Sequence, residues 1–213
     1  MNTDALIATL SRSLKPVPRW AVRRRLLLGI LAGGAITLLL VVAGLGIRPD
    51  ISLAMHGFAF WMKWTYTASL GIFSIVLVSR LARPEAISLR GLWLLAVPFV
   101  LLAVVAAIEM AHVAPGDWLK MWLGRTWKLC PWLVLMLAGP IFIGLLWSFR
   151  KLAPTRLRAA GAAAGFAAGA WAATLYCLHC PEVSAIFVLT WYTLGIALAA
   201  GAGALIGPRF LRW

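Results

Sequence analysis

The residues best suited to chemistry lie in one short stretch, Cys177-Leu178-His179-Cys180. Cysteine thiols form disulfides in oxidising compartments and bind soft metals, and the imidazole of His179 adds a further donor. A single Cys-x-x-Cys is weak evidence, because small buried residues at helix ends also show this spacing. The third cysteine, Cys130, opens a separate apolar segment. The positions of the elements therefore decide whether the three thiols meet.

Other catalytic chemistry lacks its parts in this chain. Only six residues are acidic, and there is no phosphate-binding glycine loop and no Ser-His-Asp arrangement. We therefore predict no enzyme activity. The net charge of +14 would suggest nucleic acid binding in a soluble protein, but these cations lie between apolar runs. No direct nucleic-acid partner is predicted.

Transmembrane helices must position the candidate groups. The chain is 63% hydrophobic and 12% charged, whereas soluble domains are about half apolar and a quarter charged. A membrane helix needs about 20 mainly apolar residues. We predict an all-α membrane protein with six transmembrane helices, a cytoplasmic N-terminal segment over 1–25, a transmembrane domain over 26–208 and a cytoplasmic tail over 209–213. The expected spans are 26–47, 58–79, 92–108, 129–149, 159–177 and 184–207, of which the fifth is the least apolar.

The distribution of Lys and Arg predicts the orientation of the helices. Fifteen of the 20 basic residues fall on one side of the predicted spans. The positive-inside rule then places both termini in the cytoplasm of a bacterium, with the bilayer of its inner membrane around a multi-pass chain. All three cysteines are expected in one layer at the opposite, periplasmic face.

Three charged residues are expected near that outer face. Lys63 lies close to one end of the second span, and we expect its amine to reach the interface. Glu109 ends the third span, and it either reaches the interface or pairs with Arg125 or Lys128. Glu182 is expected to place its charge at the N-terminus of the sixth span.

The N-terminal segment contains a predicted short amphipathic helix that two prolines end. Such a helix either lies on the membrane surface or docks into the groove of a partner, and the pattern leaves both open. The following Arg23–Arg25 run is interpreted as a topology signal that touches anionic lipid. The apolar face of the helix consists of Leu6, Ile7, Leu10 and Leu14.

Small residues recur every four positions in the last two spans. This spacing lets helix backbones approach closely, and we predict packing within the chain rather than between copies. The residues concerned are Gly161, Gly165, Gly169, Gly195, Ala199, Gly203 and Gly207.

Particular motifs make the chain resemble the NrsF-type membrane anti-sigma factors, a bacterial family of six-span proteins. The most specific motif is His179-Cys180-Pro181-Glu182, followed by the aromatic segment 187–192. Further similarities are Gly46-Ile47-Arg48-Pro49-Asp50, Cys130-Pro131 and the two ends of the chain.

The resemblance implies a function as well as a fold. It implies sequestration of an extracytoplasmic-function sigma factor at the membrane, and a stress response in which cysteines matching Cys130 and Cys180 sense metal or oxidants. Cys177 is an extra thiol, so the sensing state could be Cys130–Cys180, Cys177–Cys180 or a soft metal ion. That ion, held by Cys130, Cys180 and His179, is the one cofactor considered. The expected sigma-binding residues are Leu6, Ile7, Leu10, Leu14, Arg83 and Arg156.

Two other classes of protein remain as alternatives. A small heavy-metal transporter or channel should carry cysteines or charges within its spans, and none is clearly placed there. A membrane thiol redox protein would need a quinone or a second exchanging pair of cysteines, and the chain has only three cysteines.

Overall fold

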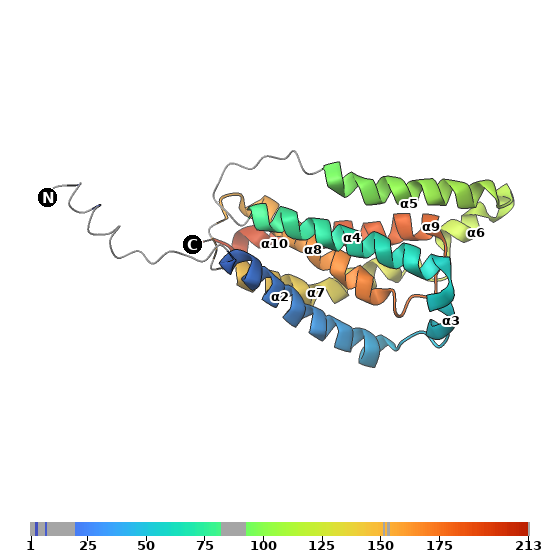
Figure 1. Cartoon of the computed structure of the whole chain (residues 1–213), viewed down its shortest axis with the longest axis horizontal. Coiled ribbons are helices and arrows are strands. Elements are labelled where there is room, and N and C mark those ends of the chain that lie inside the picture. Colours follow the sequence, from blue (N-terminus) through green and yellow to red (C-terminus); the bar gives the residue numbers. More distant parts are fainter. Residues whose placement is uncertain are drawn as a thin grey trace.

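The computed structural model describes residues 3, 7, 20–81, 93–150, 152 and 154–212. Within this part, the ordered structure is helical and contains no strand. The long helices lie side by side and alternate in direction along the chain (Figure 1). We call the end of the bundle that holds Cys130, Cys177 and Cys180 the thiol end. The opposite end, where the first long helix begins and the last one ends, is called the terminal end.

Helices occur at all six positions where a span was predicted. The long helices are α2 (Ala21–Leu39, extended by the π-helix η1, Leu40–Leu45), α4 (Phe58–Leu81), α5 (Trp93–Ala111), α7 (Cys130–Phe149), α8 (Leu157–Tyr176) and α10 (Thr193–Phe210). The short elements are α3 (Ile51–His56), η3 (Pro115–Asp117), α6 (Trp118–Leu123), α9 (Ala185–Phe187) and η4 (Val188–Tyr192). Because α9, η4 and α10 are continuous, they form one helical rod.

Among the described residues, five helical segments are long and apolar enough to cross a membrane, and α8 is not one of them. Alanine and glycine dominate α8, and thirteen of its 20 residues are buried. It packs against α4, α7 and α10 in the middle of the bundle (Figure 1). A helix that neighbouring helices surround does not need the strongly apolar surface that lipid contact demands. Its low hydropathy is therefore explained by its central position.

The predicted packing of small residues within the chain is confirmed. A Cβ atom at Gly161 would lie 2.9 Å from the Cα of Gly207 on α10. A Cβ atom at Gly165 would lie 3.0 Å from the Cα of Ala200. Side chains at these positions would force α8 and α10 apart, because the obstacle is backbone.

The first long helix begins earlier than the apolar run that predicted it. The helix α2 starts at Ala21, and the backbone N–H of Arg24 donates to the carbonyl of Trp20 at 2.8 Å. Backbone hydrogen bonds continue a helix beyond the apolar residues, so the arginines of the Arg23–Arg25 run belong to its first turns. Of the predicted amphipathic helix, only Thr3 and Ile7 are among the described residues, which leaves that prediction open.

Candidate functional site

The three cysteines come together at the thiol end from three different elements. Cys130 is the first residue of α7, Cys177 directly follows α8, and Cys180 lies in the loop between α8 and α9. All three are free thiols, and each side chain is fully buried. The structure therefore joins the Cys-x-x-Cys stretch to the cysteine that is almost 50 positions away.

Cys180 interacts directly with Cys130 across the elements. Their buried side chains lie close enough for each thiol to affect the ionisation of the other. Cys177 instead donates to the carbonyl of Ala173 in its own helix at 3.3 Å and also interacts with Thr67 of α4. The Cys130–Cys180 pair links α7 to the loop, whereas Cys177 remains bound to α8.

The two thiols next to α8 differ in acidity. The interaction with the Cys130 thiol lowers the pKa of Cys180, and the positive charge of Lys63 acts in the same direction against the effect of burial. Burial raises the pKa of Cys177 to about 11. Because the thiolate is the reactive form, Cys180 is suited to be the nucleophile and Cys177 is not.

Two buried cations hold the loop that carries Cys180. The ammonium of Lys63, on α4, donates to the carbonyls of Cys180 at 3.0 Å and Glu182 at 2.6 Å. The guanidinium of Arg48 donates to the same Cys180 carbonyl at 3.4 Å, and its backbone N–H donates to the carbonyl of Leu178 at 3.1 Å. Arg48 is fixed in turn by an ion pair with Asp50 at 2.6 Å.

The prediction that Lys63 extends to the interface is wrong. Its side chain has no exposed surface, and its amine points into the bundle. The loop offers two carbonyls whose hydrogen bonds replace those that water would provide.

His179 is bound to the end of η1 through one of its ring nitrogens. Its Nδ1 makes a hydrogen bond with the carbonyl of Gly46 at 2.8 Å, and its ring lies 5.7 Å from that of Tyr176. Across the part of the chain that the structure describes, no three His, Cys, Asp or Glu side chains are grouped as a metal site. The predicted ligand set of Cys130, Cys180 and His179 is therefore not assembled, because the imidazole is bound to the end of η1.

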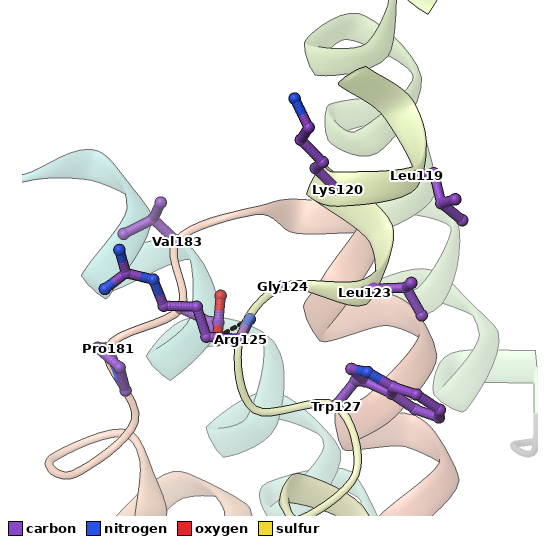
Figure 2. A pocket seen from close by; sticks show the side chains of 9 residues that line it. Leu119, Lys120, Leu123, Gly124, Arg125, Trp127, Pro181 and Val183 are labelled. Atoms are coloured by element: carbon purple, nitrogen blue, oxygen red, sulfur yellow. Dashed lines mark hydrogen bonds between the residues drawn. The ribbon is translucent and has the colours of Figure 1, made fainter. Parts of the chain in front are cut away.

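Glu182 connects the loop of Cys180 to the segment just before Cys130. Its carboxylate accepts the backbone N–H groups of Arg125 at 2.7 Å and Thr126 at 3.1 Å, and the Thr126 hydroxyl at 3.1 Å. Gly124 allows this contact, since its φ is +56° and a Cβ there would lie 2.6 Å from a Glu182 oxygen. Figure 2 shows Gly124 and Arg125 next to the loop that contains Pro181 and Val183. Both loops border an open cavity of about 630 Å³.

The expected roles of the two glutamates are corrected. The backbone N–H at the start of α9 donates to Glu109, not to Glu182, with an Ala185 N to Glu109 Oε2 distance of 2.7 Å. Glu109 therefore acts at the N-terminus of the last helical rod instead of pairing with Arg125 or Lys128. The pattern of apolar segments in the sequence does not indicate which backbone N–H groups each carboxylate would bind.

The predicted sigma-binding residues are only partly described. Leu6, Leu10, Leu14 and Arg83 lie outside the described residues. Ile7 is exposed, and Arg156 is exposed directly before α8 at the terminal end.

Residues that sequence reasoning missed surround the thiols. Tyr176 and Tyr192 are buried beside them, and Thr67 faces Cys177. The Tyr192 hydroxyl has no oxygen or nitrogen partner in the described part, and its polar neighbours are the thiols of Cys177 and Cys180. For Lys63 a signal existed, because an ionisable residue inside an apolar span is a functional candidate by default. The tyrosines carry no comparable signal.

In the described residues, fold and site define a helical protein with several helices long and apolar enough to cross a membrane, and with a pair of buried free thiols at one end of its bundle. The family model described as "Negative regulator of sigma F" (NrsF) matches residues 10–213. The chain belongs to this family of anti-sigma factors, which confirms the resemblance inferred from its motifs, and a sigma factor is its implied partner.

Two curated relatives agree with the family match. The chain is 39% identical over 216 residues to the "Probable anti-sigma-F factor NrsF" of Azospira oryzae, with all of both chains covered. It is also 39% identical over 212 residues to the "Anti-sigma-F factor NrsF" of Caulobacter vibrioides, with 99% of this chain and 97% of the relative covered. No solved structure shows a significant match.

Proposed function

We propose that this protein holds an extracytoplasmic-function sigma factor at the bacterial inner membrane and releases it when Cys130 and Cys180 are oxidised. The observation that carries the proposal is that these two fully buried thiols, which belong to different elements, lie together at the thiol end. Membership of the NrsF family supplies the regulatory class.

The proposed topology has six spans, with the thiol end in the periplasm and both termini in the cytoplasm. The alternating directions of the long helices and the excess of Lys and Arg at the terminal end support it. The helix α8 counts as the remaining span, because 20 residues of helix are about 30 Å long and its neighbours shield it from lipid. The thiols then face an oxidising compartment.

The sigma factor is proposed to bind at the terminal end. The apolar face of Leu6, Ile7, Leu10 and Leu14 would fill a groove of the partner, and Arg83 and Arg156 would meet acidic side chains. A charged residue in a desolvated apolar contact is strongly unfavourable. Leu10→Asp should therefore release the sigma factor while the protein stays in the membrane at its normal level. Unchanged retention would refute this docking site.

The proposed signal is a thiol–disulfide exchange with a small disulfide oxidant. The Cys180 thiolate attacks one oxidant sulfur and expels the other half as a thiolate. Cys130 then loses its proton, attacks the Cys180 sulfur and expels the second half. Two cysteines are oxidised to one disulfide, and the oxidant is reduced to two thiols that take up the two protons.

A Cys130–Cys180 bond would change the relation between two elements. A disulfide requires an S–S distance of about 2.05 Å and a narrow range of Cα separations, so it replaces a loose contact with a fixed geometry. The change would act on the start of α7 and on the loop that Lys63 and Arg48 bind to α4 and α2. A Cys177–Cys180 bond would close only a local loop. A Cys130–Cys180 bond is therefore better suited than a Cys177–Cys180 bond to change the arrangement of the helices.

A sigma-dependent reporter in cells tests this proposal. Cys130→Ser and Cys180→Ser should abolish the response to a thiol oxidant while sigma retention persists, whereas Cys177→Ser should retain most of the response. Because a soft metal could also bridge two thiols, parallel cultures with cadmium show whether metals use the same pair. A full oxidant response in the Cys130→Ser/Cys180→Ser double variant would refute the proposed signal.

A further inference from the structure

Lys63 is a buried cation that forms no ion pair in the described part of the chain, although its charge acts on the Asp50 carboxylate from a longer distance. Its side chain has no exposed surface, and its hydrogen bonds go to two backbone carbonyls. The described ion pairs join Arg48 to Asp50 and Lys120 to Asp117. Carbonyl dipoles offset only part of the cost of burying a full charge, so such a group needs a counter-charge nearby.

The thiol of Cys180 is the group placed to provide that counter-charge. The two carbonyls that Lys63 binds belong to Cys180 itself and to Glu182. The ammonium therefore contacts the residues directly before and directly after Pro181. The Glu182 carboxylate is already bound by Arg125 and Thr126, and the Asp50 carboxylate is bound by Arg48. Among the remaining neighbours, the Cys180 sulfur can carry a negative charge at the least cost.

We propose that Lys63 is a positioning residue and the counter-ion of the Cys180 thiolate, and that it loses its counter-charge when Cys180 enters a disulfide. The cation fixes the loop through two hydrogen bonds and favours the ionised sulfur. In the disulfide the sulfur is neutral, and the buried ammonium is left with carbonyls alone. Lys63 then moves toward water at the thiol end and displaces α4, whose other end is Leu81 at the terminal end. This last step rests on the proposed function.

Other groups face the Cys180 sulfur and set limits on the effect of Lys63. The sulfur interacts with the side chains of Cys130, Cys177, Tyr176 and Tyr192. Arg48 adds a second cation, although Asp50 neutralises much of its field. The lowered pKa of Cys180 agrees with this arrangement, in which the interaction with Cys130 contributes most and the charge of Lys63 adds to it.

Charge variants of the purified full chain in detergent test the first half of the proposal. The titration of Cys180 is followed by the ultraviolet absorbance of the thiolate, as the difference between each protein and its Cys180→Ser counterpart. Lys63→Met should move the titration midpoint up by about one pH unit, which corresponds to about tenfold less thiolate below the midpoint. At a pH below both midpoints it should also slow Cys130–Cys180 bridging by oxidised glutathione by about threefold, because the tenfold loss of thiolate is partly offset by the greater nucleophilicity of the less acidic thiol. Lys63→Arg should retain the low midpoint.

Arg125→Met is the matched control, since it removes an exposed positive charge at the same end and leaves the backbone N–H that Glu182 binds. It should leave the midpoint unchanged. A folded Lys63→Met protein with the midpoint of the control would overturn the proposal.

Amine labelling of the unmodified protein tests the second half without any variant. A water-soluble amine reagent should leave Lys63 unlabelled in the reduced protein and label it after the Cys130–Cys180 bond forms, as measured by peptide mass spectrometry. Protection of Lys63 in the fully bridged protein would overturn this half. Neither experiment involves a sigma factor, so failure of the proposed function, seen in the reporter, is distinguishable from failure here.

Discussion

The two ends of the bundle use positive charge in opposite ways. At the thiol end, Lys63 and Arg48 are buried and bind backbone carbonyls of the loop that carries Cys180. At the terminal end, most of the described arginines are exposed, including Arg24 and Arg156. Buried cations contribute to the structure and respond to changes in nearby charge, whereas exposed cations remain available to lipid headgroups or to an acidic partner. This contrast agrees with the proposed functions, in which the thiol end senses and the terminal end binds the sigma factor.

The largest effect on stability is expected from the carboxylate of Glu182, which joins the loop of Cys180 to the segment before Cys130. Glu182→Ala leaves the N–H groups of Arg125 and Thr126 without their acceptor, and it should lower the free energy of unfolding by roughly 1.5–3 kcal/mol. Glu182→Gln should cost less, because its amide oxygen still accepts. Denaturant titration in detergent measures both. Equal stability of Glu182→Ala and the unmodified protein would show that the thiol end is not held together by this contact.

A smaller loss of stability is expected at Gly124, where the backbone has a positive φ and the Glu182 side chain occupies the space that a Cβ would need. Gly124→Ala should lower the free energy of unfolding by about 1–2 kcal/mol through backbone strain and displacement of the glutamate. Gly116→Ala is the control, since nothing lies within 4 Å of a Cβ there and its φ is not in the positive range. The same titration compares them, and equal losses would argue against a specific role for Gly124.

The thiols of the thiol end should differ in their pH dependence. The fold lowers the pKa of Cys180, so its thiolate contributes stability above the ordinary thiol pKa of about 8.5, and that contribution is lost as the pH falls through the lowered pKa. Labelling of Cys180 should therefore persist below pH 8.5, while Cys177 should react only as the pH approaches about 11. Alkylation rates of each cysteine across pH, resolved by mass spectrometry, measure this. Identical profiles would remove the distinction between the two thiols.

The smallest effect on stability is expected at the terminal end. Arg156→Gln removes an exposed charge and should change the free energy of unfolding by no more than about 0.5 kcal/mol. If Arg156 meets an acidic residue of the sigma factor, the variant should still weaken binding, by up to about fivefold. Copurification at increasing salt measures the loss. A stability change as large as that of Glu182→Ala would contradict the contrast between the two ends.

The sequence allowed the helices to be predicted because apolar runs of sufficient length have few other structures in a membrane. It also indicated that Cys130 and Cys180 would lie at one depth, since helices of similar length alternate in direction. The central place of α8 was not predictable, because hydropathy does not show which helices surround another.

The polar contacts of the thiol end were the part that sequence reasoning could not supply. Lys63 was expected at the interface and is buried, and Glu109 occupies the helix start that had been assigned to Glu182. The position of each charged group depends on which loop carbonyl or N–H lies within reach after the helices have packed. Such partners are 76 and 117 residues apart in the chain, so no local pattern indicates them.

Release of a bound sigma factor from the protein in lipid nanodiscs tests the central claim most directly. The sigma factor that copurifies with the chain is bound, oxidised glutathione is added, and both the bridged fraction and the released fraction are followed over time. The account predicts that release follows formation of the Cys130–Cys180 bond, that Cys177→Ser behaves like the unmodified protein, and that Cys130→Ser retains the sigma factor. A fully bridged protein that still holds its sigma factor, or equal release from Cys130→Ser, would contradict it.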